Sequence, residues 1–100
     1  MNSSIRITEE AREDIDEAVE WYDEQKSGLG DLFLQRLNES FSAIQQNPAS
    51  FKRVYRQLRQ SALKKFPYVV LYKVENNIIL IYCVFHTSKD PKKKLKRLKS

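Results

Sequence analysis

The most regular pattern of apolar residues lies between Lys64 and His86. Two mainly apolar runs, 66–74 and 78–85, flank the polar turn Glu75-Asn76-Asn77. The runs are rich in Val, Ile, Tyr and Phe, which favour strands, and Asn tolerates the positive φ angles of a tight hairpin turn. The second run is apolar at every position, which is typical of a strand covered on both faces. The pattern therefore predicts a β-hairpin in the middle of a sheet.

An amphipathic helix is predicted between Thr8 and the Ser27-Gly28 pair. Thr8 is a suitable N-cap, and Glu9 and Glu10 then lie in the first turn, where the helix dipole favours acids. The apolar stripe, which Trp21 widens, consists of Ala11, Ile15, Ala18, Val19 and Tyr22. We expect the acids around the rest of the helix to form a solvated face, because no His or Cys lies among them to indicate a metal site. These acids are Glu13, Asp14, Asp16, Glu17, Glu20, Asp23 and Glu24.

A second helix is predicted from Leu29 to about Asn47, where Pro48 ends it. Its apolar stripe, flanked by Leu34, consists of Leu29, Phe33, Leu37, Phe41 and Ile44. The short break at residues 27–28 predicts that the two helices form an antiparallel hairpin whose apolar faces cover the sheet.

Two further strands complete the predicted order. Residues 3–7 can form a short strand, and residues 54–66 alternate loosely as a strand that is irregular at its start, before Pro67 turns the chain. The order β-α-α-β-β-β indicates a single α+β domain, residues 1–100, with a small antiparallel-rich sheet packed against the helical hairpin. The basic tail, 92–100, has Leu95 and Leu98 spaced for one side of a short helix.

Composition narrows the function classes. The single cysteine, Cys83, cannot form a disulfide within the chain, and no run of 18 apolar residues indicates a membrane span. We therefore expect a protein of the reducing cytoplasm without membrane contact. With two glycines and one histidine, the sequence carries no Gly-rich phosphate loop, no Ser-His-Asp signature and no Cys/His metal spacing, so no cofactor or metal is expected.

Charge is divided unevenly along the chain. Residues 1–50 carry four Lys or Arg against eleven Asp or Glu, a net charge of −7, whereas residues 51–100 carry fourteen against two, a net charge of +12. A basic surface of this size attracts nucleic acid or an acidic protein at long range, although it can also be simply solvated.

Several residues are candidates for a site in the basic half. His86 is the only side chain with an ordinary pKa near neutrality, and it lies where a strand leaves the core, so it can act as a general acid or base or bond a neighbouring loop. Tyr68 and Tyr72 share one face of a strand and can stack on bases or pack in the core. The cations that could converge on a phosphate are Arg56, Arg59, Lys64, Lys65, Lys73 and Lys89.

Several segments, taken in chain order, carry a family resemblance. They are a short strand with Thr8-Glu9-Glu10-Ala11, the Trp21-Tyr22 pair, the 65–72 run from Lys65-Phe66-Pro67-Tyr68 to Tyr72, the Ile-rich strand, and His86-Thr87-Ser88-Lys89-Asp90-Pro91. Together they resemble the RelE/ParE superfamily, the toxins of bacterial type II toxin–antitoxin modules, over nearly the whole chain. The resemblance implies a growth-inhibiting toxin, as in plasmid stabilisation, that a cognate antitoxin wraps and neutralises in a hetero-oligomer.

The superfamily has two mechanisms, and the resemblance favours the ParE-like one. ParE-like members poison DNA gyrase, whereas RelE-like members cut mRNA in the ribosome without a metal. The Phe66-Pro67-Tyr68 turn and the His86–Pro91 exit look closer to ParE-like members. A third alternative is a non-toxic RNA-binding relative.

The residues that the RelE-like nuclease pattern requires are only partly present. That pattern has an arginine entering the third strand, where this chain has Val69, and paired lysines in the preceding strand, where it has Gln60 and Ala62. Lys89 matches a basic position after the last strand, and His86 matches a histidine that some relatives place there. A C-terminal tyrosine is replaced by Leu95. We therefore expect gyrase inhibition, with mRNA cleavage through His86 as the alternative.

Overall fold

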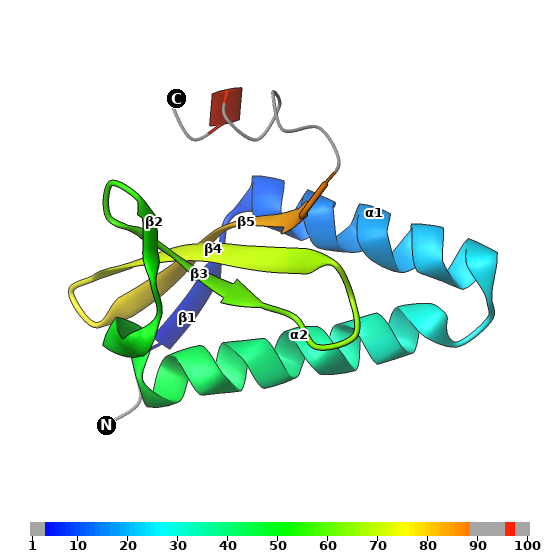
Figure 1. The fold of residues 1–100 in the computed structure, drawn as a ribbon, viewed down its shortest axis with the longest axis horizontal. Helices are drawn as coiled ribbons and strands as arrows, with labels where there is room; N and C mark the ends of the chain where they lie inside the picture. Colours follow the sequence, from blue (N-terminus) through cyan, green and yellow to red (C-terminus); the bar gives the residue numbers. More distant parts are fainter. Residues whose placement is uncertain (1–3, 89–95, 98–100) are drawn as a thin grey trace.

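The computed structural model describes residues 4–88 and 96–97, and its elements follow the predicted order (Figure 1). They are β1 (Ser4–Ile7), α1 (Glu9–Gln25), α2 (Leu29–Gln46), the short 3-10 helix η1 (Pro48–Ser50), β2 (Arg53–Tyr55), β3 (Leu58–Ala62), β4 (Tyr68–Glu75) and β5 (Ile78–His86). The predicted α+β architecture is confirmed. Most of the basic tail at 92–100, with Leu95 and Leu98, lies outside the described residues, as does Lys89.

The strand predicted at 54–66 is wrong as a single element. It forms two strands, β2 and β3, which pair antiparallel across a tight turn. Arg56 occupies this turn with a φ of 50°, a left-handed conformation that interrupts an extended strand. The irregularity expected at the start of this segment is therefore a complete reversal of the chain.

The sheet has the strand order β1-β5-β4-β3-β2, so the β4–β5 hairpin lies in its interior as predicted. β1 pairs parallel with β5, and the remaining neighbours are antiparallel. Asn76 and Asn77 both have positive φ, 50° and 63°, which the tight turn between twisted strands requires.

The two helices run antiparallel along the sheet and are joined by a short link (Figure 1). The Thr8 side chain accepts a hydrogen bond from the Ala11 N–H, as expected of an N-cap. The Asp23 carboxylate accepts the N–H of Gly30 at 2.7 Å and so satisfies one of the free donors at the start of α2. A Cβ at position 30 would lie 2.7 Å from that carboxyl group, so this approach requires glycine.

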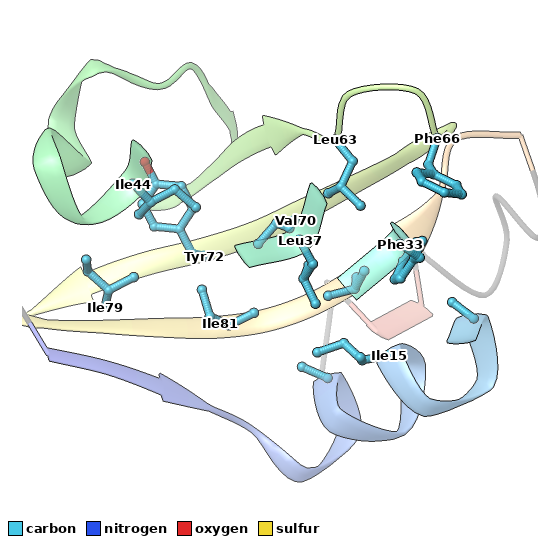
Figure 2. Packing of buried hydrophobic residues seen from close by; sticks show 13 residues of the cluster. Ile15, Phe33, Leu37, Ile44, Leu63, Phe66, Val70, Tyr72, Ile79 and Ile81 are labelled. Carbon is cyan, nitrogen blue, oxygen red and sulfur yellow. The ribbon is translucent and has the colours of Figure 1, made fainter. Parts of the chain in front are cut away.

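The main core lies between the sheet and the helices (Figure 2). Its largest fully buried members include Phe33 of α2 and Tyr72, Ile79 and Ile81 of the sheet. At one end of the core the rings of Tyr22, Phe33, Phe66 and Tyr68 contact one another at centroid distances of 4.8–6.0 Å.

Trp21 does not join the core, contrary to the prediction, and 45% of its surface is exposed. Neighbouring residues on a helix point about 100° apart. Because Tyr22 takes the inward position, Trp21 is directed outward, and the two rings meet edge to face at 5.0 Å.

Asp14 is not part of a solvated face, which corrects a second expectation for α1. β1 pairs only with residues 78–81 of β5. The backbone N–H and C=O groups of β5 beyond residue 81, on the edge that faces away from β4, therefore need other partners. The Asp14 carboxylate accepts the Val84 N–H at 3.1 Å and Arg97 Nη1 at 2.8 Å. Arg97 also lies over the Phe85 ring, at 4.8 Å from its centroid. Burial lowers the pKa of Arg97, but the hydrogen bond and the charge of Asp14 outweigh it and raise the pKa overall.

Candidate functional site

The structure divides the candidate residues between the two ends of β3. Lys64 and Lys65 lie in the turn after β3, close in sequence to Tyr68 at the start of β4. Arg56 lies in the turn before β3, and Arg59 is paired with Tyr72 near that end of the strand. The candidate cations in the part of the chain that the structure describes therefore do not all converge on one phosphate position.

His86, the last residue of β5, lies at the same end of the sheet as Lys64 and Lys65. It faces the side of the sheet that the helices cover. It is paired across the hairpin with Tyr68, and the two rings meet edge to face at 5.2 Å. Its Nδ1 accepts the N–H of Ser88 at 3.1 Å, the kind of loop contact expected of a structural histidine. The His86 residue is half-buried.

Tyr68 and Tyr72 both point toward the helices and pack in or against the core. Tyr72 is fully buried, its hydroxyl donates to the Pro48 carbonyl at 2.6 Å, and burial raises its pKa to about 12. Burial, followed by the charge of Tyr22, raises the pKa of Tyr68. Of the two roles considered for these tyrosines, Tyr72 therefore has the packing role. Its buried ring has no face exposed on which a nucleic-acid base could stack.

Arg59 also has a structural partner at this end of the sheet. Its Nη1 donates to the Phe51 carbonyl at 2.6 Å, which fixes the segment before β2. A guanidinium has five N–H donors, so Arg59 can donate further hydrogen bonds besides this one.

The sheet separates His86 from the positions where the nuclease pattern requires cations. Gln60 pairs with Leu71, and Ala62 pairs with Val69. These residues alternate with Ser61 and Val70, which face the helices, so they lie on the other side of the sheet. In this chain that patch is neutral, and Val69 is buried.

A pocket of about 260 Å³ lies on this other side, beside the β2–β3 turn. Its lining residues are Tyr55, Arg56, Gln57, Leu58, Lys73 and Tyr82. The sequence points to Arg56 and Lys73 but not to the pocket, because the lining residues come from four strands and a turn. One sequence feature could have indicated a site in this region: residues 51–74 contain seven Lys or Arg and no Asp or Glu.

Within the described ranges, no group of three or more His, Cys, Asp or Glu side chains is arranged to hold a metal ion. The same residues include no helix with the length and hydropathy needed to cross a membrane.

Comparisons with known proteins agree with this geometry. The family model described as "ParE toxin of type II toxin-antitoxin system, parDE" matches residues 5–91. A solved structure described as "Chromosomal ParDE TA system from P. aeruginosa" has a similar fold, with a TM-score of 0.76 and 19% sequence identity, over 86% of this chain and 97% of that chain. No curated protein sequence matches the chain significantly.

Proposed function

Since the chain belongs to the ParE toxin family of type II toxin–antitoxin systems, we propose that it inhibits DNA gyrase and that a cognate antitoxin neutralises it in the cytoplasm. Family membership confirms the ParE-like resemblance identified in the sequence. The observation that carries the proposed mechanism is the separation of His86 from the neutral patch at Gln60, Ala62 and Val69. Among the described residues, His86 and that patch lie on opposite sides of the sheet and cannot act together on one phosphate, which favours binding over catalysis as the mechanism.

Charge supports a target that includes DNA. Seven cations and no acids lie between residues 51 and 74, a segment that contains β2, β3 and most of β4. Such a surface favours a complex of a protein with DNA by long-range attraction, and its contribution decreases as salt increases.

The competing function is mRNA cleavage, and the half-buried ring of His86 at the end of β5 is the feature that favours it. The lysines of the 63–67 turn precede Tyr68, its partner on β4, so cations are available near this end of the sheet. In this alternative His86 exchanges a proton with the ribose or the leaving oxygen.

Controlled expression in a bacterial host, with cellular mRNA and plasmid supercoiling measured in parallel, separates the two functions. Gyrase inhibition predicts intact mRNA together with altered supercoiling or DNA damage. Rapid mRNA cleavage with normal DNA would contradict the proposal. Normal growth, with the folded chain present and no antitoxin, would indicate a non-toxic relative instead.

The variant His86→Ala tests the same question on the protein. Gyrase inhibition predicts that toxicity survives, because the ring then has a structural role, in which it packs against Tyr68 and accepts a hydrogen bond from Ser88. Loss of toxicity with unchanged circular dichroism and mRNA cleavage by the parent chain would assign the ring a proton-transfer role.

The antitoxin is tested by co-expression. A neutralising partner encoded beside this chain is expected to restore growth and to co-purify with it as a stable hetero-oligomer. Neighbouring products that neither bind nor restore growth would contradict this part of the proposal.

A further inference from the structure

We propose that the pocket beside the β2–β3 turn binds a 5′-nucleotide, with the base against its tyrosines and the phosphate between Arg56 and Lys73. This site is separate from gyrase inhibition, and its test contains no topoisomerase. Its volume of about 260 Å³ is below the roughly 300–1,000 Å³ of pockets that enclose drug-sized ligands, so it suits one nucleotide unit.

The anion-binding half of the pocket has two cations in reach of an incoming phosphate. Arg56 is exposed, and its guanidinium lies 5.2 Å from the centre of the Tyr55 ring. Lys73 Nζ is 3.3 Å from Glu75 Oε1, but 62% of the Glu75 side chain is exposed. An exposed ion pair of this kind contributes little, so a doubly charged phosphate can displace the carboxylate.

The other half of the pocket is apolar and held in place. Leu58 is buried, and the rings of Tyr55 and Tyr82 supply aromatic surface. The Tyr82 hydroxyl donates to the Arg97 carbonyl at 3.3 Å, which fixes the ring from its far end. Stacking on aromatic rings is the usual way in which proteins hold a base without reading its sequence.

The conformation of the β2–β3 turn determines how the Arg56 guanidinium is presented to the pocket. Arg56 has a φ of 50°, and an L-residue in this region costs about 1–2 kcal/mol relative to ordinary conformations. The guanidinium is therefore presented at a turn position where glycine would be accommodated more easily.

A nucleotide fits this combination better than an acidic peptide does. A carboxylate side chain would pair with the two cations but has no planar ring to set against Tyr55 and Tyr82. A nucleotide carries a planar aromatic ring and a phosphate in one compact unit, which matches both halves of the lining.

The test is an NMR titration of the full purified chain with adenosine 5′-monophosphate, with adenosine and inorganic phosphate as probes of the separate halves. We expect saturable shifts at Tyr55, Arg56 and Tyr82, and tighter binding of the nucleotide than of either fragment. Phosphate binding as tight as the nucleotide would overturn the proposal, as would tighter, competing binding of a polyglutamate peptide.

Two glycine variants provide a matched control. Arg56→Gly and Lys65→Gly each remove one positive charge, and each places glycine at a backbone position with positive φ, 50° and 68°. Lys65, however, lies at the opposite end of β3 and does not line the pocket. We expect about tenfold weaker nucleotide binding for the first variant and less than twofold change for the second. Equal weakening by both would show nonspecific charge attraction and overturn the site.

The aromatic half is tested at Tyr82. The variant Tyr82→Phe keeps the ring and is expected to bind within threefold of the parent, whereas Tyr82→Leu loses stacking and is expected to bind about tenfold more weakly. Equal binding by the leucine variant, with thermal unfolding matching that of Tyr82→Phe, would contradict a stacked base.

Discussion

The two sides of the sheet are built from alternating residues of the same strands but have different properties. Toward the helices, β4 and β5 contribute Val70, Tyr72 and Ile81 to a continuous apolar core. Away from the helices, the same strands contribute Lys73 and Tyr82 to a small, partly open pocket. Alternation thus lets one strand stabilise the fold on one side and present chemistry on the other.

This difference explains why the basic half of the chain does not form a single site. Arg59 of β3 lies on the side of Tyr72, which faces the helices, whereas Lys73 of β4 faces the pocket on the other side. Arg56 lies in the turn before β3, and Lys64 and Lys65 lie in the turn after it. A high density of cations along a sequence therefore does not show that their side chains meet in space. The register of the strands determines which of them share a side of the sheet.

The largest expected effect is on the helix-covered side. Phe33→Ala should lower the free energy of unfolding by about 3–5 kcal/mol, because Phe33 is fully buried among Tyr22, Phe66 and Tyr68. Urea unfolding followed by circular dichroism measures this. Val74→Ala, at a position that is 42% exposed, is the control and should change stability by no more than about 0.5 kcal/mol. Similar losses of unfolding free energy for both variants would contradict the assignment of Phe33 to the core and Val74 to the surface.

A smaller loss is expected at the edge of β5. Asp14→Ala removes the acceptor of both the Val84 N–H and the Arg97 guanidinium and should cost about 2–3 kcal/mol. Glu10→Ala is the matched control, because Glu10 also pairs with Arg97 but its side chain is 72% exposed, and it should cost no more than about 0.5 kcal/mol. Equal costs in thermal unfolding would mean that Asp14 acts only through charge.

The buried tyrosine predicts a pH dependence. Because the folded-state pKa of Tyr72 is about 12 and its ordinary value is 10.0, the folded chain keeps a proton that the unfolded chain loses. This stabilisation is complete below pH 10 and is lost as the pH rises toward 12, a difference of at most about 2–3 kcal/mol. Tyr72→Phe should flatten the stability profile between pH 10 and 12 relative to the parent. Parallel profiles would contradict burial of an ionisable hydroxyl.

The smallest effect is expected at the pocket. Arg56→Gly should change the free energy of unfolding by less than about 1 kcal/mol, because relief of a positive φ offsets the greater freedom of glycine in the unfolded chain. Thermal unfolding of the variant beside the parent chain measures this. A loss comparable to that of Asp14→Ala would mean that the guanidinium has a structural role.

The fold was predictable from the sequence because the signals that define it are local. Helical spacing, the Thr8 cap and the asparagine turn each depend on a few neighbouring residues, and all three were confirmed. The β2–β3 reversal was missed because no Gly, Asn or Asp marks it, and an arginine occupies the left-handed position instead.

The candidate site was less predictable because it depends on long-range register. Nothing near Asp14 indicates that Arg97 and Val84 will contact it, since they lie 83 and 70 residues away. Likewise, Lys73 and Tyr82 share a pocket with the β2–β3 turn only after the strands have paired. The sequence could nominate His86 and the cations, but not which side of the sheet each would occupy.

The parallel pairing of β1 with β5 also governs when the molecule can finish folding. Ser4 pairs with Ile78, so the first strand lacks its neighbour until 74 further residues have been synthesised. At roughly 5–20 residues per second, that interval is about 4–15 s. Closing so long a loop is slow compared with forming the helical hairpin, which needs only local contacts. The nascent chain thus emerges with its helices ready and its sheet incomplete, and a truncated product that stops before β5 has no route to the finished fold.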